Sequence, residues 1–254
     1  MNYSMEELRK LNNRDFYSPV SKFMHNTLLY VTRPLLRTSI TPNQITVFWI
    51  TLQLVGSALM LKGDYWSNVL GVLLYVGAAL FDYVDGQIAR IKKISTYQGI
   101  FLEDLGIYFG TPIFMLCFSI GVSQSFHDYR YVVLGVVSAL SVLYSKLAIT
   151  NPYSYPSPFR EKIVQLHGHL SSRSKTNKIV YLFFFFRRSQ PFNFLLVGII
   201  FNIPRVVLML YTALHFLEFG RRMLVQLKTL HRLDKEQRIL HLSKTADGDK
   251  DPDT

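Results

Sequence analysis

The sequence predicts an all-α integral membrane protein with about six transmembrane helices and an N-terminal amphipathic helix at the membrane interface. Three observations support this fold class. Hydrophobic residues make up 49% of the 254 residues, and they occur in long blocks. Several blocks approach the roughly 20 residues that a helix needs to cross a bilayer core of about 30 Å. The charged residues, which give the chain a net charge of +11, fall between the blocks.

The N-terminal segment, residues 1–37, is predicted to be cytoplasmic and to hold the interfacial helix. Over residues 17–40, apolar residues are mixed with basic residues such as Lys22 and Arg33. This mixture is typical of a helix that lies on the membrane surface. Pro34 is expected to bend or end that helix. The polar start of the chain is not typical of a cleavable signal peptide, so the first apolar block is expected to be retained.

The membrane domain, residues 38–226, is predicted to contain four clear spans and a divided fifth and sixth. The four spans cover residues 44–61, 66–81, 107–122 and 131–149. The apolar stretch 192–219 is divided at Asn202-Ile203-Pro204, because proline after a polar residue favours a break. One long kinked helix is the alternative interpretation. Residues 227–254 are predicted to form a polar cytoplasmic tail with a disordered end.

Lysine and arginine residues indicate the topology, because they concentrate on the cytoplasmic side of membrane proteins. They gather before the first span, between spans two and three, between spans four and five, and in the tail. This asymmetry fits a multi-pass protein with both termini in the cytoplasm. Basic residues spread between apolar blocks favour anionic lipid headgroups or phosphorylated substrates and disfavour nucleic acid. The single cysteine, Cys117, excludes a disulfide within the chain and a zinc cluster of cysteines.

The second apolar block runs directly into a polar segment that suits phosphate chemistry. Asp82 and Asp85 are three residues apart and share a helix face. Two carboxylates this close repel each other unless a cation lies between them, and Mg²⁺ is a suitable hard cation. Gly86 and Ala89 on that face leave room for a bulky ligand. Arg90 follows with a planar set of donors suited to phosphate oxygens.

The third apolar block is preceded by Gly99 and Glu103, which share a face because they are four residues apart. If the second and third spans pack together, Glu103 can complete a metal site with Asp82 and Asp85. The active site is therefore expected at the cytoplasmic edge of the membrane.

These residues resemble the signature of the CDP-alcohol phosphotransferase superfamily, D-x2-D-G-x2-A-R-x8-G-x3-D-x3-D. The chain matches it at Asp82, Asp85, Gly86, Ala89, Arg90 and Gly99. Residues 41–46 are also similar to the segment with which the family usually begins its first span. The third acidic position of the signature falls on Glu103, which keeps the charge. The fourth falls on Ile107, which cannot ionise.

The resemblance implies a transferase of phospholipid biosynthesis with six transmembrane helices, which could pair as a homodimer. Such an enzyme moves a phosphoryl-alcohol group, most often phosphatidyl, from a donor such as CDP-diacylglycerol to a small alcohol and releases CMP. Gly86 and Ala89 would admit the cytidine nucleotide, and Arg90 would hold a phosphate. One or two Mg²⁺ or Mn²⁺ ions would be held by Asp82, Asp85 and Glu103.

The residue that takes the proton from the attacking alcohol is the main open point, because the family's proposed base falls on Ile107. Besides Glu103, the candidate is Asp104, although it points about 60° away from Ile107 around the helix. A solvated or helix-pairing acid is the alternative interpretation of Asp104, and Tyr108 is a weaker candidate base. Weak candidates for binding the acceptor or its headgroup are Lys146, Arg187 and Arg188. These three could instead contact lipid headgroups, Lys146 by snorkelling.

Two classes of function follow from these observations. The first is an active membrane transferase. The second is a catalytically weak or inactive relative that binds a CDP-linked ligand or a partner protein, and it rests entirely on Ile107. A transporter is disfavoured, because its acidic residues would be expected near the middle of the bilayer rather than at the edge.

Overall fold

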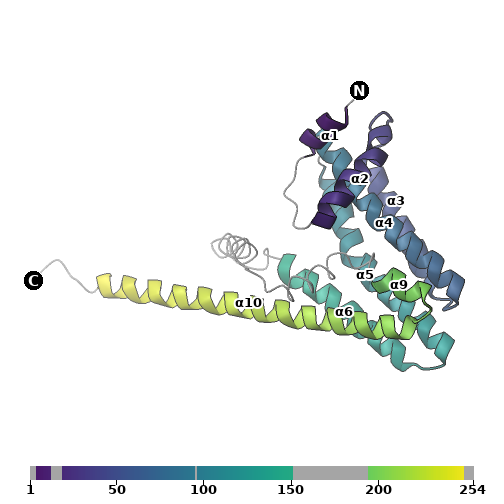
Figure 1. Ribbon diagram of the computed structural model, residues 1–254. Helices are drawn as coiled ribbons and strands as arrows, with labels where there is room; N and C mark the ends of the chain where they lie inside the picture. The colour runs from purple at the N-terminus through teal and green to yellow at the C-terminus, as the bar shows by residue number, and fades with distance from the viewer. Residues whose placement is uncertain (1–3, 13–18, 95, 151–193, 249–254) are drawn as a thin grey trace, which may run out of the picture.

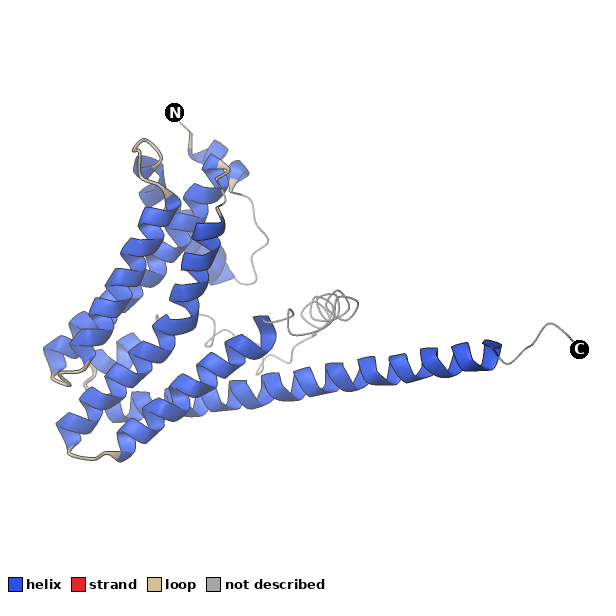
Figure 2. Cartoon of the chain, turned by 180° about the vertical axis from the view of Figure 1, so that it is seen from behind, coloured by secondary structure: helices blue, strands red, loops and turns tan. Residues whose placement is uncertain are grey.

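The computed structural model describes residues 4–12, 19–94, 96–150 and 194–248. Within these residues all regular secondary structure is α-helical, which confirms the predicted all-α class (Figure 2). The helices are α1 (Met5–Leu11), α2 (Pro19–Leu35), α3 (Pro42–Met60), α4 (Tyr65–Lys92), α5 (Tyr97–Phe126), α6 (Arg130–Thr150), α9 (Phe194–Ile200) and α10 (Pro204–Gly248). Helix α2 occupies the region predicted for the amphipathic helix and ends one residue after Pro34. Its position on a membrane surface stays a prediction.

Two helices in the described part of the chain, α4 and α5, are long and apolar enough to cross a membrane by length and composition. Helices α3 and α6 coincide with the predicted first and fourth spans, but they do not meet the same criterion. The number of six transmembrane helices therefore stays a prediction.

Several boundaries differ from the predicted ones. Helix α4 continues without a break from the second apolar block through the polar segment to Lys92, and α5 begins at Tyr97, ten residues before the predicted third span. The predicted break near Pro204 is confirmed, because α9 and α10 are separated there and Asn202 has a φ of 53°. Residues 227–248 of the predicted polar tail are helical and belong to α10, and the last six residues lie outside the described part.

The helices form two packed groups (Figure 1). Helices α3, α4 and α5 lie side by side, and α6 and α10 pack against each other and against α5. The short helices α1 and α2 cover the C-terminal part of α4. Both views show α10 continuing beyond α6 and projecting away from the bundle. This arrangement places the end of α4 and the start of α5 beside the start of α3.

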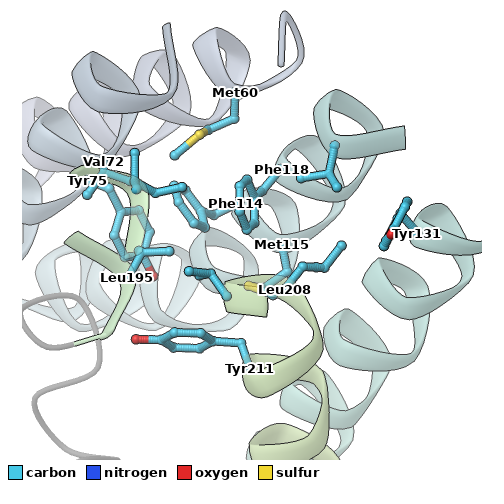
Figure 3. Packing of buried hydrophobic residues seen from close by; sticks show 13 residues of the cluster. Met60, Val72, Tyr75, Phe114, Met115, Phe118, Tyr131, Leu195, Leu208 and Tyr211 are labelled. Atoms are coloured by element: carbon cyan, nitrogen blue, oxygen red, sulfur yellow. The ribbon is translucent and has the colours of Figure 1, made fainter. Parts of the chain in front are cut away.

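Two hydrophobic clusters hold the groups together. The larger cluster joins α4, α5, α9 and α10, with the rings of Tyr75 and Phe114 only 4.2 Å apart between their centroids and Leu208 packed nearby (Figure 3). The smaller cluster joins Leu29 of α2 to Ile88 of α4, and both side chains are fully buried. The face of α4 that carries Asp85, Gly86 and Ala89 is not part of this cluster.

A backbone contact between Gly121 of α5 and Met60 of α3 predicts a large effect on stability. A Cβ atom at Gly121 would collide with the Met60 carbonyl oxygen, and it would lie 3.0 Å from the Gly63 nitrogen. Because these neighbours are backbone atoms, they cannot rotate away. We expect Gly121→Val to lower the free energy of unfolding by about 3 kcal/mol or more, which is the upper end of the cost of overpacking a core. The corresponding fall in Tm is roughly 6–12 °C.

The matched control is Gly77→Val, because a Cβ atom at Gly77 of α4 meets nothing within 4 Å. Thermal unfolding of the purified protein in detergent measures both variants. An equal Tm for the two variants would show that the close approach at Gly121 does not constrain the fold.

Asp64 gives α4 a pH-dependent N-terminal cap. The Ser67 amide donates to Asp64 Oδ1 at 2.9 Å, and the hydrogen bonds from Ser67 hold the pKa of Asp64 below its ordinary value. A lowered folded-state pKa stabilises the fold above the ordinary pKa of about 4 and loses this effect as the pH falls through the folded value. We expect Asp64→Asn to be less stable than the wild type at pH 6, with the difference shrinking as the pH falls below about 4. Parallel Tm curves from pH 6 to 3 would contradict this role.

Candidate active site

The C-terminal part of α4 presents different residues to different neighbours, because successive helix residues are rotated by about 100°. Val84 and Ile88 are buried against α1 and α2. Gln87 faces α2, where Thr32 donates to its Oε1 at 2.6 Å. The remaining face carries the charged and small residues that the sequence analysis identified. The apolar packing therefore fixes which way these residues point.

That face borders an open pocket of about 450 Å³ between the start of α3, the end of α4 and the start of α5. The pocket is lined by Pro42, Asn43, Thr46, Asp85, Gly86, Ala89, Arg90, Lys93, Ile94, Thr96, Gly99, Ile100 and Glu103. Six of these are residues that the sequence analysis assigned to the site or its signature. The pocket brings two acidic and two basic side chains together with residues small enough to admit a ligand.

Asp85 is oriented by two donors from α3. Thr46 Oγ1 and Trp49 Nε1 both donate to Asp85 Oδ2 at 2.7 Å, and only 7% of Asp85 is exposed. Trp49 reaches this position because it packs where α5 has Gly106, whose missing side chain leaves the necessary space. Neither donor was predicted from the sequence, although Thr46 lies in the family-like segment 41–46. These two hydrogen bonds from α3 hold the Asp85 carboxylate in one orientation.

The three predicted metal ligands are near one another but are not equally placed. Asp85 and Glu103 line the pocket, whereas Asp82 is half-buried and does not. The negative charges of Asp85 and Glu103 act on Asp82. Within the described residues, no three acidic, histidine or cysteine side chains stand close enough together to hold a metal ion as placed. The oxygen donors suit Mg²⁺ or Mn²⁺ chemically, and joint coordination by all three would require side-chain movement.

The small residues of the site allow close packing around it. The Arg90 guanidinium lies over Gly86, where a Cβ atom would be only 3.2 Å from Arg90 Nη1. Gly99 lies against Asn43, and a Cβ atom there would be 2.7 Å from Asn43 Oδ1. Thr96 caps α5 by accepting from the Gly99 amide at 3.0 Å and is also hydrogen-bonded to Asn43. Replacing either glycine would therefore displace a polar side chain that borders the pocket.

Two cations stand on the α4 side of the pocket. Arg90 donates from Nε to Asn12 Oδ1 of the N-terminal segment at 2.9 Å. Lys93 follows one turn later as the C-cap of α4, with a left-handed φ of 53°. In the sequence Lys93 indicates only topology, because basic residues after a span usually mark the cytoplasmic side. Its position in the pocket adds a second group that can attract phosphate.

The other predicted residues lie elsewhere. Asp104 is exposed and Ile107 is 39% exposed, and neither of them borders the pocket. Tyr108, the weaker candidate base, is also absent from the pocket wall. Lys146 belongs to α6, and none of the described residues that line the pocket comes from this helix. The two remaining acceptor candidates, Arg187 and Arg188, lie outside the described residues.

The described residues define an apolar helical bundle with a pocket that is lined by acidic, basic and small residues. The chain belongs to the CDP-alcohol phosphatidyltransferase family, whose sequence profile matches residues 39–211. A comparison with curated proteins gave no match. The family is membrane-embedded, transfers a phosphoryl-alcohol group from a CDP-alcohol to an alcohol and generally uses divalent metals. The resemblance drawn from the sequence is thereby confirmed.

Proposed function

We propose that this protein is a membrane transferase of phospholipid biosynthesis. It moves a phosphatidyl or related phosphoryl-alcohol group from CDP-diacylglycerol, or another CDP-alcohol, to a small alcohol and releases CMP. The observation that carries this proposal is the pocket in which Asp85 and Glu103 face Arg90 and Lys93. A diphosphate that carries a cation is bound by acidic groups, which hold the cation, and by basic groups, which bind the phosphate oxygens.

In the proposed reaction, the acceptor oxygen attacks the phosphorus that carries the donor alcohol. A new phosphorus–oxygen bond forms, and the bond from that phosphorus to the bridging oxygen breaks, so that CMP leaves with the bridging oxygen. Arg90 and Lys93 bind the phosphates, and Gly86 and Ala89 make room for the cytidine. Thr46 and Trp49 hold the Asp85 carboxylate in a fixed orientation. Alignment and charge stabilisation of this kind are the main catalytic contributions in phosphoryl transfer.

The proposed metal ligands are Asp82, Asp85 and Glu103. They would hold a divalent cation, which would neutralise charge on the diphosphate. The acceptor must also lose its proton, and we assign this role to Glu103 or, as a substitute base, to Asp104. General base catalysis contributes typically about 10²–10⁴-fold, so the loss of the acid at Ile107 slows the reaction without preventing donor binding.

The proposed topology is a multi-pass protein with six transmembrane helices, an interfacial α2 and both termini and the active site in the cytoplasm. The proposed divisions are an N-terminal segment 1–37, a membrane domain 38–226 and a tail 227–254. Membrane lipids surround the domain, and two copies could pair. Lys146, Arg187 and Arg188 are the residues that we propose for the acceptor or headgroup site.

A second function is favoured by one observation. Ile107 replaces the fourth acid of the signature, and neither Asp104 nor Tyr108 borders the pocket. A chain with this arrangement could bind a CDP-linked ligand or a partner protein with little or no turnover. This alternative keeps the same pocket and the same donor and differs only in catalysis.

The two functions are separated by assaying the purified full chain in detergent with CDP-diacylglycerol and Mg²⁺ or Mn²⁺. CMP release is measured across a panel of small alcohols, and CDP binding is measured separately by calorimetry. CMP release that depends on an added alcohol supports the transferase. CDP binding without CMP release for any alcohol supports the binder, and absence of both would refute both functions.

A further inference from the structure

The end of helix α1 reaches the catalytic segment of α4 from outside the pocket. Asn12 is the C-cap of α1 and is only 2% exposed. Its Oδ1 accepts from Arg90 Nε at 2.9 Å, across 78 positions of sequence. The residue proposed to bind donor phosphate is therefore held by the N-terminal segment rather than by its own helix alone.

The orientation of the Asn12 amide follows from the chemistry of its neighbours. Arginine can only donate hydrogen bonds, so the amide atom that faces Arg90 must be the oxygen. The amide nitrogen then faces His25 Nε2 of α2 at 2.6 Å, and that ring nitrogen accepts. His25 is 3% exposed. The Asn12 side chain is thus fixed at both ends, one by α2 and one by α4.

A second buried amide repeats this connection one turn earlier on α4. Gln87 is fully buried, and its Nε2 donates to the His25 carbonyl oxygen at 2.8 Å. Its Oε1 accepts from Thr32 Oγ1 at 2.6 Å. A buried polar network whose members all have partners rigidifies the elements that it joins. Helices α1 and α2 therefore hold the segment from Gln87 to Arg90 at two points.

The consequence for Arg90 is a fixed guanidinium plane. A guanidinium is rigid and planar, so the hydrogen bond that Nε donates also restrains the direction of its two Nη groups. Those groups lie over Gly86, with Nη1 3.2 Å from the place that a Cβ atom would take. Asparagine is neutral, so its contribution to Arg90 is orientation and not charge. An arginine held in this way is preorganised for phosphate oxygens.

We propose that Asn12 is a positioning residue for the CDP-linked donor, and that His25 supports it. Asn12 fixes the plane of the Arg90 guanidinium, and the N-terminal helices are in this way part of the donor site. The inference rests on the proposed function, since it assigns Arg90 to the donor phosphates.

The test measures CDP binding to the purified full chain in detergent with Mg²⁺, together with the KM values for donor and acceptor. We expect Asn12→Ala to weaken CDP binding about tenfold, as for the loss of a hydrogen bond to a charged group. The donor KM rises similarly, while the acceptor KM and kcat change little. In an Arg90→Lys background, which lacks the Nε donor, Asn12→Ala adds almost nothing. His25→Leu, which leaves Asn12 in place, weakens CDP binding several-fold.

The structural control is Thr32→Val, which breaks a hydrogen bond of the same network without contacting Arg90. It is expected to lower Tm and to weaken CDP binding much less than Asn12→Ala, because the hydrogen bond from Arg90 to Asn12 remains. The inference is overturned if Asn12→Ala and His25→Leu bind CDP like the wild type while Arg90→Ala does not. It is also overturned if Thr32→Val weakens binding as much as Asn12→Ala. If the proposed function is wrong, the wild-type protein itself will neither bind CDP nor release CMP, which distinguishes that failure from the failure of this inference.

Discussion

Replacing Asp85 by asparagine is expected to abolish CMP release and leave the fold intact. Asparagine has nearly the same shape, and its amide oxygen can still accept from Thr46 and Trp49, which both donate to Asp85 Oδ2. The substitution removes only the negative charge and one strong cation ligand. We expect CMP release to fall at least about 100-fold, since loss of a metal ligand or its support typically costs this much.

The matched control is Asp64→Asn, the same substitution at the opposite end of α4. At neutral pH it is expected to lower Tm moderately and to leave CMP release close to the wild-type rate. A second measurement, Tm of Asp85→Asn itself, shows whether the protein has folded. CMP release by well-folded Asp85→Asn at more than a tenth of the wild-type rate would contradict the role of this carboxylate.

Restoring an acid at position 107 is expected to raise the rate of CMP release. Ile107 stands at the fourth acidic position of the family signature and is 39% exposed, so an aspartate there would not be buried. If the missing base limits the reaction, Ile107→Asp should increase kcat by about 100-fold or more, the lower end of general base catalysis. The donor KM should stay nearly constant, because the pocket residues that hold the diphosphate are unchanged.

Ile107→Asn is the control, because asparagine has the size and polarity of aspartate and cannot take the proton. Initial rates of CMP release at saturating donor and acceptor compare the two variants. Equal rates for Ile107→Asp and Ile107→Asn would mean that another group already serves as the base. Glu103, which lines the pocket, or Asp104 as a substitute would then be assigned that role.

The sequence predicted the parts of the site that depend on local spacing. Asp85, Gly86 and Ala89 share a helix face because of the helical period, and that face borders the pocket. Glu103 was expected beside them on the assumption that two neighbouring apolar helices pack together. The structure shows another arrangement, in which α3 packs against both α4 and α5 and so brings Glu103 to the same pocket as Asp85.

Long-range partners could not be predicted in the same way. Thr46 and Trp49 lie 39 and 36 positions from Asp85, and Asn12 lies 78 positions from Arg90. No spacing rule relates residues on different helices, because their register depends on how the helices pack. The far end of α10 was missed for another reason. Hydropathy marks only the apolar part of a helix, whereas the helix itself continues through polar residues to Gly248.

The central claim is that Asp82, Asp85 and Glu103 share a divalent cation that carries the donor diphosphate. Electron paramagnetic resonance of Mn²⁺, titrated into the purified full chain with CDP, tests it most directly. We predict one saturable Mn²⁺ site in the wild type that is lost or much weakened in Asp82→Asn, Asp85→Asn and Glu103→Gln, and is kept in Asp64→Asn. Unchanged Mn²⁺ binding in the variant that carries all three substitutions would contradict the claim.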